Sequence, residues 1–260
     1  MVTSLLAATW FRPRHPNPEA KMRLFGFPYA GGTGSIFNSW PSQLPQFVEV
    51  CPVHLPGREP RFRERPFTRL APLVESLAEG ILPLLDKPFA FFGHSMGALI
   101  GFELIRFLQK EYQPGPFHFF ASGCSAPQMR RRIRPIHHLP EPELVRELRR
   151  LDGTPKLVFE HAELMSLMIP IMRADFEISE TYSYSSQSLL NCAITAFGGS
   201  RDKSVSRWKL AGWSHQTNSH FSRYMFPGDH FFLHTAEKQL LHRVGLELST
   251  NLPLAAKCDR

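Results

Sequence analysis

One serine lies in a pentapeptide whose glycines have the spacing that a catalytic nucleophile requires. Ser95 is the centre of the sequence G-H-S-M-G at 93–97, directly after the apolar run Phe89–Phe92 and before a segment of helical periodicity. A strand, a sharp turn and a helix in this order lift the hydroxyl out of a sheet into a cleft, and the glycines allow the tight bend. Because a serine hydroxyl is a poor nucleophile at neutral pH, it needs a base and an acid that orients the base.

Candidates for both partners follow in the chain order Ser, Asp, His, which is typical of α/β-hydrolases. Asp202 comes after the strand-like run Ala193–Phe197 and two glycines, so its carboxylate would lie just beyond the carboxyl end of a strand. His230 lies in a glycine-containing turn that follows the short run Arg223–Phe226. We expect His230 to accept the serine proton and Asp202 to orient the imidazole.

Other residues remain open as alternatives for these roles. His94 adjoins the serine, but neighbouring side chains usually diverge. Asp229 adjoins His230 and would face away from it, and Asp175 falls in a helical segment. Three further histidines are possible bases, although none lies in a comparable glycine-flanked turn: His215, His220 and His234.

A glycine-rich loop follows the first predicted strand and can supply backbone donors to an oxyanion. The sequence P-Y-A-G-G-T-G at 28–34 contains neither phosphate-binding pattern, G-x-x-x-x-G-K-[ST] or G-x-G-x-x-G. Attack on a carbonyl needs two N–H groups aimed at the developing charge. We expect these from Met96, the residue after the nucleophile, and from Ala30, with Tyr29 as the alternative to Ala30.

The elements that must position these residues alternate between strands and helices. Continuous apolar runs predict strands that are covered on both faces of a parallel sheet: Met22–Phe27, Val48–Leu55, Phe89–Phe92, Phe117–Ser122 and Ala193–Phe197. Apolar stripes at helical spacing predict helices at Leu70–Leu85, Ala98–Tyr112 and Thr235–Leu248. The alternation predicts a doubly wound α/β fold.

The alternation breaks between about 128 and 186. Helical patterns at Pro140–Leu151 and Glu160–Tyr182 occur there without a convincing strand. An all-helical insertion between two late strands would lie above the strand ends, so we expect a lid over the active site. The methionine-containing stretch Leu164–Met172 would either line an acyl channel or pack the lid onto the domain. The predicted organisation is a lead-in at 1–20 and one domain at 21–260 with the lid inserted.

The length, hydrophobic content and charge of the chain limit the classes of protein and of partner that we expect. The chain has 260 residues, 43% of them hydrophobic, and a formal charge of +7. The arginines cluster at 58–69, 130–134 and 146–150, which indicates a solvated basic surface or the steering of an acidic partner. We expect no nucleic-acid partner, because no binding module accompanies the arginines.

The spacing of the cysteines does not predict a secreted protein, and the hydropathy of the chain does not predict a membrane protein. None of Cys51, Cys124, Cys192 and Cys258 forms a C-x-x-C pair, which disfavours a zinc site or a disulfide framework and fits a reducing cytoplasm. The N-terminus lacks the features of a signal peptide, and no apolar run is long enough to span a bilayer. We expect a cytoplasmic monomer.

Several segments together resemble one family. The chain is similar to the stand-alone (type II) thioesterases that accompany polyketide synthases and nonribosomal peptide synthetases, and to the medium-chain thioesterases of animal fatty acid synthesis. The resemblance rests on segments spread over most of the chain: W-F at 10–11, L-F-G-F-P-Y-A-G-G at 24–32, L-P-G-R-E at 55–59, F-G-H-S-M-G-A at 92–98, G-G-S-R-D at 198–202 and P-G-D-H-F at 227–231.

The resemblance implies an α/β-hydrolase fold and a Ser95–Asp202–His230 triad, with Ala30 and Met96 forming the oxyanion hole. It also implies hydrolysis of acyl or aminoacyl thioesters on the phosphopantetheine arm of an acyl or peptidyl carrier protein, with no metal or bound cofactor. Its L-P-G-R-E segment predicts a turn with a structural arginine, Arg58, rather than a catalytic one. The alternatives are a medium-chain fatty acyl thioesterase, a small-molecule carboxylesterase on the same fold, and a non-catalytic carrier-binding module.

Overall fold

The computed structural model describes residues 7–13, 16–112, 115–130, 134–151, 153–154 and 156–253. Arg131, Arg132 and Cys258, which figured in the sequence analysis, lie outside the described residues, as do the first six residues of the lead-in.

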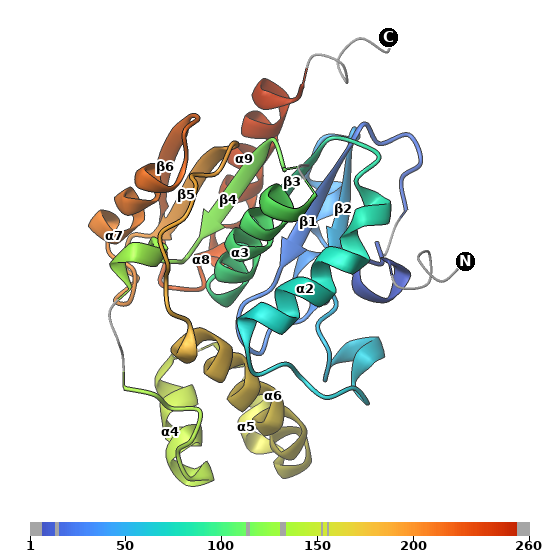
Figure 1. Cartoon of the computed structure of the whole chain (residues 1–260). Helices are drawn as coiled ribbons and strands as arrows, with labels where there is room; N and C mark the ends of the chain where they lie inside the picture. Colours follow the sequence, from blue (N-terminus) through green and yellow to red (C-terminus); the bar gives the residue numbers. More distant parts are fainter. Residues whose placement is uncertain are drawn as a thin grey trace.

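The described strands form one parallel sheet of six strands in the order β2-β1-β3-β4-β5-β6. Their bounds are β1 Met22–Phe27, β2 Val48–Pro52, β3 Phe89–His94, β4 His118–Ser122, β5 Ala193–Gly199 and β6 Phe221–Phe226. Because all strands run the same way, their carboxyl ends meet at one edge of the sheet, which is the lower edge in Figure 1.

Helices cover both faces of the sheet (Figure 1). The longer ones are α2 Leu70–Ile81, α3 Met96–Glu111, α4 Glu141–Leu151, α6 Ala162–Thr181 and α9 Glu237–Asn251. The shorter α-helices are α5 Lys156–Glu160, α7 Arg207–Ala211 and α8 Phe232–Thr235. Single turns of 3-10 helix are η1 Gly34–Phe37, η2 Trp40–Ser42, η3 Glu59–Arg61, η4 Leu82–Leu84, η5 Pro127–Met129 and η6 Gly212–Gln216.

Successive side chains of a strand point to opposite faces of the sheet, and both faces are covered here. The strands are therefore apolar at nearly every position. In β1, Phe25 and Phe27 enter the core beneath α2 and α3, whereas Met22 and Leu24 enter the core beneath α9. All four side chains are fully buried. A strand with both faces covered has no solvent side, so every position favours an apolar residue.

Helices α4, α5 and α6 lie together beyond the carboxyl edge of the sheet (Figure 1). They enclose a small core of their own, made of Leu139, Leu144, Leu148, Met165, Ile169 and Met172. The prediction of helices in this interval matches α4 and α6 within a few residues, and α5 was not predicted. Whether this helical region acts as a lid stays a prediction.

Several element boundaries differ by one to four residues from the sequence-based expectation, and two of them show why. The second strand ends at Pro52 rather than Leu55, because Val53 forms an isolated antiparallel bridge with Phe11 of the N-terminal segment. Helix α3 begins at Met96, two residues earlier than expected, since the turn at Ser95 leads directly into the helix.

No helix in the described part of the chain has the length and hydropathy needed to cross a bilayer.

Candidate active site

Ser95 occupies a strained turn between β3 and α3. Its backbone has φ 55° and ψ −113°, a region that residues other than glycine rarely adopt, and its N–H donates to the Ser122 carbonyl at 2.8 Å. The flanking glycines serve close packing rather than the bend itself. A Cβ on Gly97 would lie 2.1 Å from the Phe27 carbonyl oxygen, and one on Gly93 would lie 2.3 Å from the Gly97 carbonyl oxygen.

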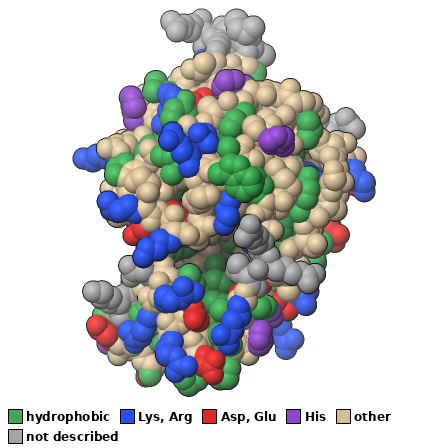
Figure 2. Space-filling model, turned by 90° about the vertical axis from the view of Figure 1, so that its left-hand side faces the viewer, with side chains coloured by type: hydrophobic (Ala, Val, Ile, Leu, Met, Phe, Trp, Pro, Cys, Tyr) green, Lys and Arg blue, Asp and Glu red, His purple; other side chains and the backbone are tan. Residues whose placement is uncertain are grey.

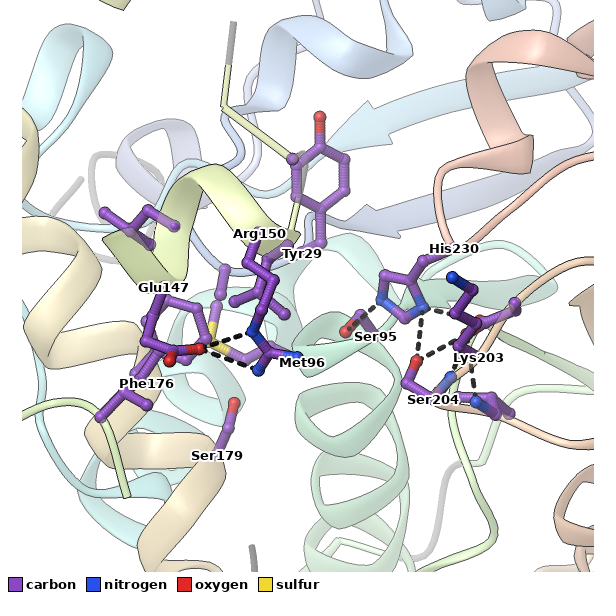
Figure 3. Close-up of a pocket in the computed structure, with 18 of the residues that line it drawn as sticks. Tyr29, Ser95, Met96, Glu147, Arg150, Phe176, Ser179, Lys203, Ser204 and His230 are labelled. Carbon is purple, nitrogen blue, oxygen red and sulfur yellow. Dashed lines mark hydrogen bonds and ion pairs between the residues drawn. The ribbon is translucent and has the colours of Figure 1, made fainter. Parts of the chain in front are cut away.

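His230 lies beside this serine (Figure 3), and Asp202 continues the hydrogen-bonded chain on the other side of the imidazole. The Ser95 Oγ is 3.0 Å from His230 Nε2, and His230 Nδ1 is 2.7 Å from Asp202 Oδ2. Because an ionised carboxylate can only accept, the imidazole proton lies on Nδ1 and the Nε2 lone pair faces the serine hydroxyl. The arrangement is the one in which an imidazole can remove the hydroxyl proton.

Hydrogen bonding keeps Asp202 ionised. Burial of the carboxylate opposes its charge, but the hydrogen bonds from His230 and Ser204 outweigh burial and lower the pKa of Asp202 to about 2. Its Oδ1 accepts from the Ser204 N–H at 2.7 Å, the Ser204 hydroxyl at 2.6 Å and the Val205 N–H at 3.1 Å. Ser204 was not predicted as a site residue, although an Asp two residues before a Ser is a common signal for this type of turn.

His94 is a second histidine at the site, and its ring supports His230. It is fully buried, with Nε2 2.9 Å from the His230 carbonyl oxygen and Nδ1 2.9 Å from the Ser122 hydroxyl. Burial and the neighbouring His230 keep the pKa of His94 well below its usual range, so the ring is neutral. Since a carbonyl only accepts, Nε2 donates to His230 and Nδ1 accepts from Ser122.

We expect His94→Leu to lower both stability and turnover. The change leaves the His230 carbonyl without its donor, which costs about 1–3 kcal/mol for a buried group. For a domain of this size the melting temperature should fall by about 2–10 °C. Displacement of the imidazole should lower kcat by about 10-fold. Calorimetry and steady-state kinetics measure both effects against the exposed control His215→Leu, and an unchanged kcat in a destabilised variant would limit His94 to a structural role.

The loop after β1 forms a tight turn that lines the same cavity as Ser95. The Gly32 N–H donates to the Tyr29 carbonyl at 2.8 Å, and Gly31, with φ +75°, is the third residue of this turn. Within the described part of the chain, the N–H groups of Ala30 and Met96 have no protein acceptor. Both residues line the cavity that contains Ser95, as does Tyr29. The oxyanion-hole assignment stays a prediction that this geometry supports.

A large cavity lies between the helical region and the sheet edge. It has a volume of about 1110 Å³ and reaches Ser95 and His230. Figure 2 shows this side of the molecule, with a hollow floored by hydrophobic side chains and with Lys and Arg gathered on both sides of it. The apolar lining from the helical region consists of Ile136, Leu139, Leu148, Leu151, Met172 and Phe176, and the cations include Arg130, Arg134, Arg201, Lys203 and Lys209.

The structure also places two groups of residues whose roles the sequence left open. Met172 lines the cavity and packs in the core of the helical region, and a role of the methionine-containing stretch in an acyl channel stays a prediction. Arg58 and Arg61 are only 5% and 8% exposed. These two arginines therefore do not belong to a solvated basic surface.

The sequence of the chain matches a known protein family over most of its length. A model of the thioesterase domain matches residues 22–245. The chain belongs to the thioesterase family. The prediction of a thioester hydrolase is thereby confirmed, and the parallel sheet of this thioesterase confirms the predicted α/β-hydrolase fold.

Individual relatives of the thioesterase come from secondary metabolism and from fatty acid synthesis. It is 46% identical to the gramicidin S biosynthesis protein GrsT of Aneurinibacillus migulanus over 89% of this chain and 91% of that protein. It is 34% identical to the medium-chain S-acyl fatty acid synthase thioesterase of Rattus norvegicus, over 84% of each. The solved structure of BorB, the type II thioesterase of the borrelidin biosynthetic cluster, is similar with a TM-score of 0.85 and 33% identity, over 92% of this chain and 98% of that one.

Among the described residues of the thioesterase, no group of three or more His, Cys, Asp or Glu side chains is placed to hold a metal ion.

Proposed function

We propose that the protein is a stand-alone editing thioesterase of a polyketide or nonribosomal peptide pathway, with Ser95, His230 and Asp202 as its catalytic triad. The observation that carries the proposal is the hydrogen-bonded chain from the Ser95 hydroxyl through His230 to Asp202, with 3.0 Å and 2.7 Å between successive partners. The identity to GrsT supports the pathway assignment.

In the first half-reaction the Ser95 Oγ attacks the thioester carbonyl while His230 Nε2 takes the hydroxyl proton. The Ala30 and Met96 N–H groups stabilise the oxyanion, and Asp202 offsets the charge of the imidazolium. His230 then gives the proton to the departing thiol, which leaves the acyl group as an ester on Ser95.

In the second half-reaction water attacks this ester. His230 removes a proton from the water, and the same two N–H groups stabilise the second oxyanion. Collapse of the intermediate returns the proton to Ser95 and releases the carboxylic acid. The proposed steps use side chains and backbone amides only, so no cofactor takes part in them.

The proposed substrate is an acyl or aminoacyl group on the phosphopantetheine arm of a carrier protein. The apolar lining from the helical region suits an acyl chain, and the cations at the rim suit the phosphate of the arm and an acidic carrier. Arg201 and Lys203, which flank Asp202, form no ion pair with any described residue and are exposed. The helical region would act as the lid of this cavity.

We further propose that the enzyme acts as a monomer in the cytoplasm beside its synthase. The buried thiols of Cys51, Cys124 and Cys192 are unpaired, which fits a reducing compartment.

A hydrolysis panel tests the assignment. Acetyl, aminoacyl and medium-chain acyl groups on a carrier protein are compared with a p-nitrophenyl ester of the same acyl group. We expect kcat/KM for the carrier thioesters to exceed that for the p-nitrophenyl ester by at least about 10-fold, because only the carrier and its arm reach the basic rim. A higher kcat/KM for the free ester would favour a carboxylesterase, and a strong preference for medium-chain acyl groups would favour a fatty acyl thioesterase.

A further inference from the structure

A buried ion pair joins the helical region to the body of the enzyme next to the proposed oxyanion hole. Arg58 lies in the loop after β2, and Asp175 lies on α6. The two terminal nitrogens of the Arg58 guanidinium each contact one oxygen of the Asp175 carboxylate. The Nη1–Oδ2 distance is 2.6 Å and the Nη2–Oδ1 distance is 2.8 Å. The two side chains are only 4% and 2% exposed, and 117 residues separate them in the chain.

The same two side chains hold the turn that carries Ala30. Asp175 Oδ2 accepts from the Gly31 N–H at 2.7 Å, and Arg58 Nη1 donates to the Gly32 carbonyl at 3.1 Å. Together with the Gly32 bond to Tyr29, these contacts fix the peptide groups on the carboxyl side of Ala30. Ala30 itself lines the cavity, and its N–H has no acceptor among the described residues.

Further contacts restrict the loop on both sides of this ion pair. Met172, one helical turn before Asp175, packs so closely on Gly31 that a Cβ there would lie 2.3 Å from the Met172 methyl carbon. Beyond the turn, the Glu59 carboxylate accepts from the Gly34 N–H at 3.2 Å and from the Ser35 N–H at 3.1 Å. The L-P-G-R-E segment therefore contributes two adjacent side chains that hold one loop.

We infer that Arg58 and Asp175 are positioning residues that set the oxyanion hole and couple its geometry to the seating of α6 on the enzyme. The inference rests on the proposed function, because the Ala30 N–H matters for turnover only if Ser95 attacks a carbonyl. An oxyanion donor acts only when it is already aimed at the developing charge, and a displacement of about 1 Å costs about 100-fold in rate. When α6 moves away from the sheet edge, the Gly31 N–H loses its acceptor and the turn loses its anchor.

Two variants test this coupling. Asp175→Asn keeps the shape but leaves the buried guanidinium without a counter-charge. The double variant Arg58→Met/Asp175→Leu removes both charges and retains apolar packing, which protects the fold. With a short-chain acyl N-acetylcysteamine thioester, we expect kcat to fall by about 10–100-fold in both variants. KM should change by less than about threefold, because the contacts that bind the acyl chain remain.

The matched control is Glu177→Gln. Glu177 also lies on α6 and pairs with Arg69 of the main domain, but it touches no residue of the turn. We expect its kcat to stay within about twofold of the wild type. An equal loss in the control, or an unchanged kcat in the double variant at unchanged melting temperature, would overturn the inference.

Two ligands distinguish a displaced oxyanion-hole donor from a general disruption of the active site. A trifluoromethyl ketone with the same acyl chain forms a hemiketal oxyanion on Ser95, whereas the product acid makes only ground-state contacts. We expect the inhibition constant of the ketone to rise in parallel with the loss of kcat/KM, while the dissociation constant of the acid changes by less than about threefold. Equal weakening of both ligands would overturn the inference. Failure of the wild type to hydrolyse any thioester would instead overturn the proposed function.

Discussion

We expect the replacement of Ser95 by Ala to lower kcat for carrier-bound thioesters by about 10⁴–10⁶-fold. The change removes the proposed nucleophile, while the cavity and the proposed N–H donors remain. A residual rate above the uncatalysed reaction should persist from these donors and from binding. Stopped-flow detection of the released thiol measures the loss, and KM should change little because the hydroxyl contributes to bond formation rather than to substrate binding.

The control for this variant is Ser166→Ala. Ser166 lies on the exposed side of α6 and donates only to the Glu163 carbonyl, so its loss should change kcat by less than about twofold. If Ser95→Ala kept more than about a tenth of the wild-type kcat, the hydroxyl would not be the nucleophile.

The Asp202→Asn variant should lose about 10⁴-fold in kcat with little change in fold. The Oδ1 position accepts three hydrogen bonds from Ser204 and Val205, so the amide oxygen of Asn will take that position. The NH₂ group then faces His230 Nδ1 and forces this nitrogen to accept. Its proton moves to Nε2, which can no longer take the proton of the serine hydroxyl.

Asp229→Asn distinguishes this effect from a general loss of charge near the imidazole. The Asp229 carboxylate accepts from the Phe231 N–H at 2.8 Å and makes no hydrogen bond to the His230 ring. We expect this variant to keep kcat within about threefold of the wild type. Equal losses in the two variants would contradict the orienting role of Asp202.

The sheet and the candidate triad could be read from the sequence because local signals specify them. A strand covered on both faces needs apolar residues at every position, and β1 was therefore predicted with both of its observed ends. Ser95, Asp202 and His230 each follow a predicted strand, and the carboxyl ends of parallel strands meet at one edge. Topology thus brings these three residues together without further information.

The remaining features depend on contacts that no local pattern encodes. The partner of Arg58 lies 117 residues away on α6, a helix that the sequence places above the strand ends without showing which of its residues faces Arg58. The role of His94 depends on where the backbone of His230 passes, 136 residues later. The tight bend was assigned to the glycines that flank Ser95, whereas Ser95 itself adopts the positive φ, because the sequence shows which residues permit a bend but not which residue adopts it.

The central claim is that the acyl group is transferred to the Ser95 hydroxyl before it is released. Intact-mass measurement after rapid acid quench, followed by peptide mapping, tests this claim with an aminoacyl or acyl carrier protein as substrate. The account predicts a protein heavier by one acyl group during turnover, with the added mass on the peptide that contains Ser95 and absent from Ser95→Ala. An acyl group mapped to any other residue, or the same adduct in Ser95→Ala, would contradict it.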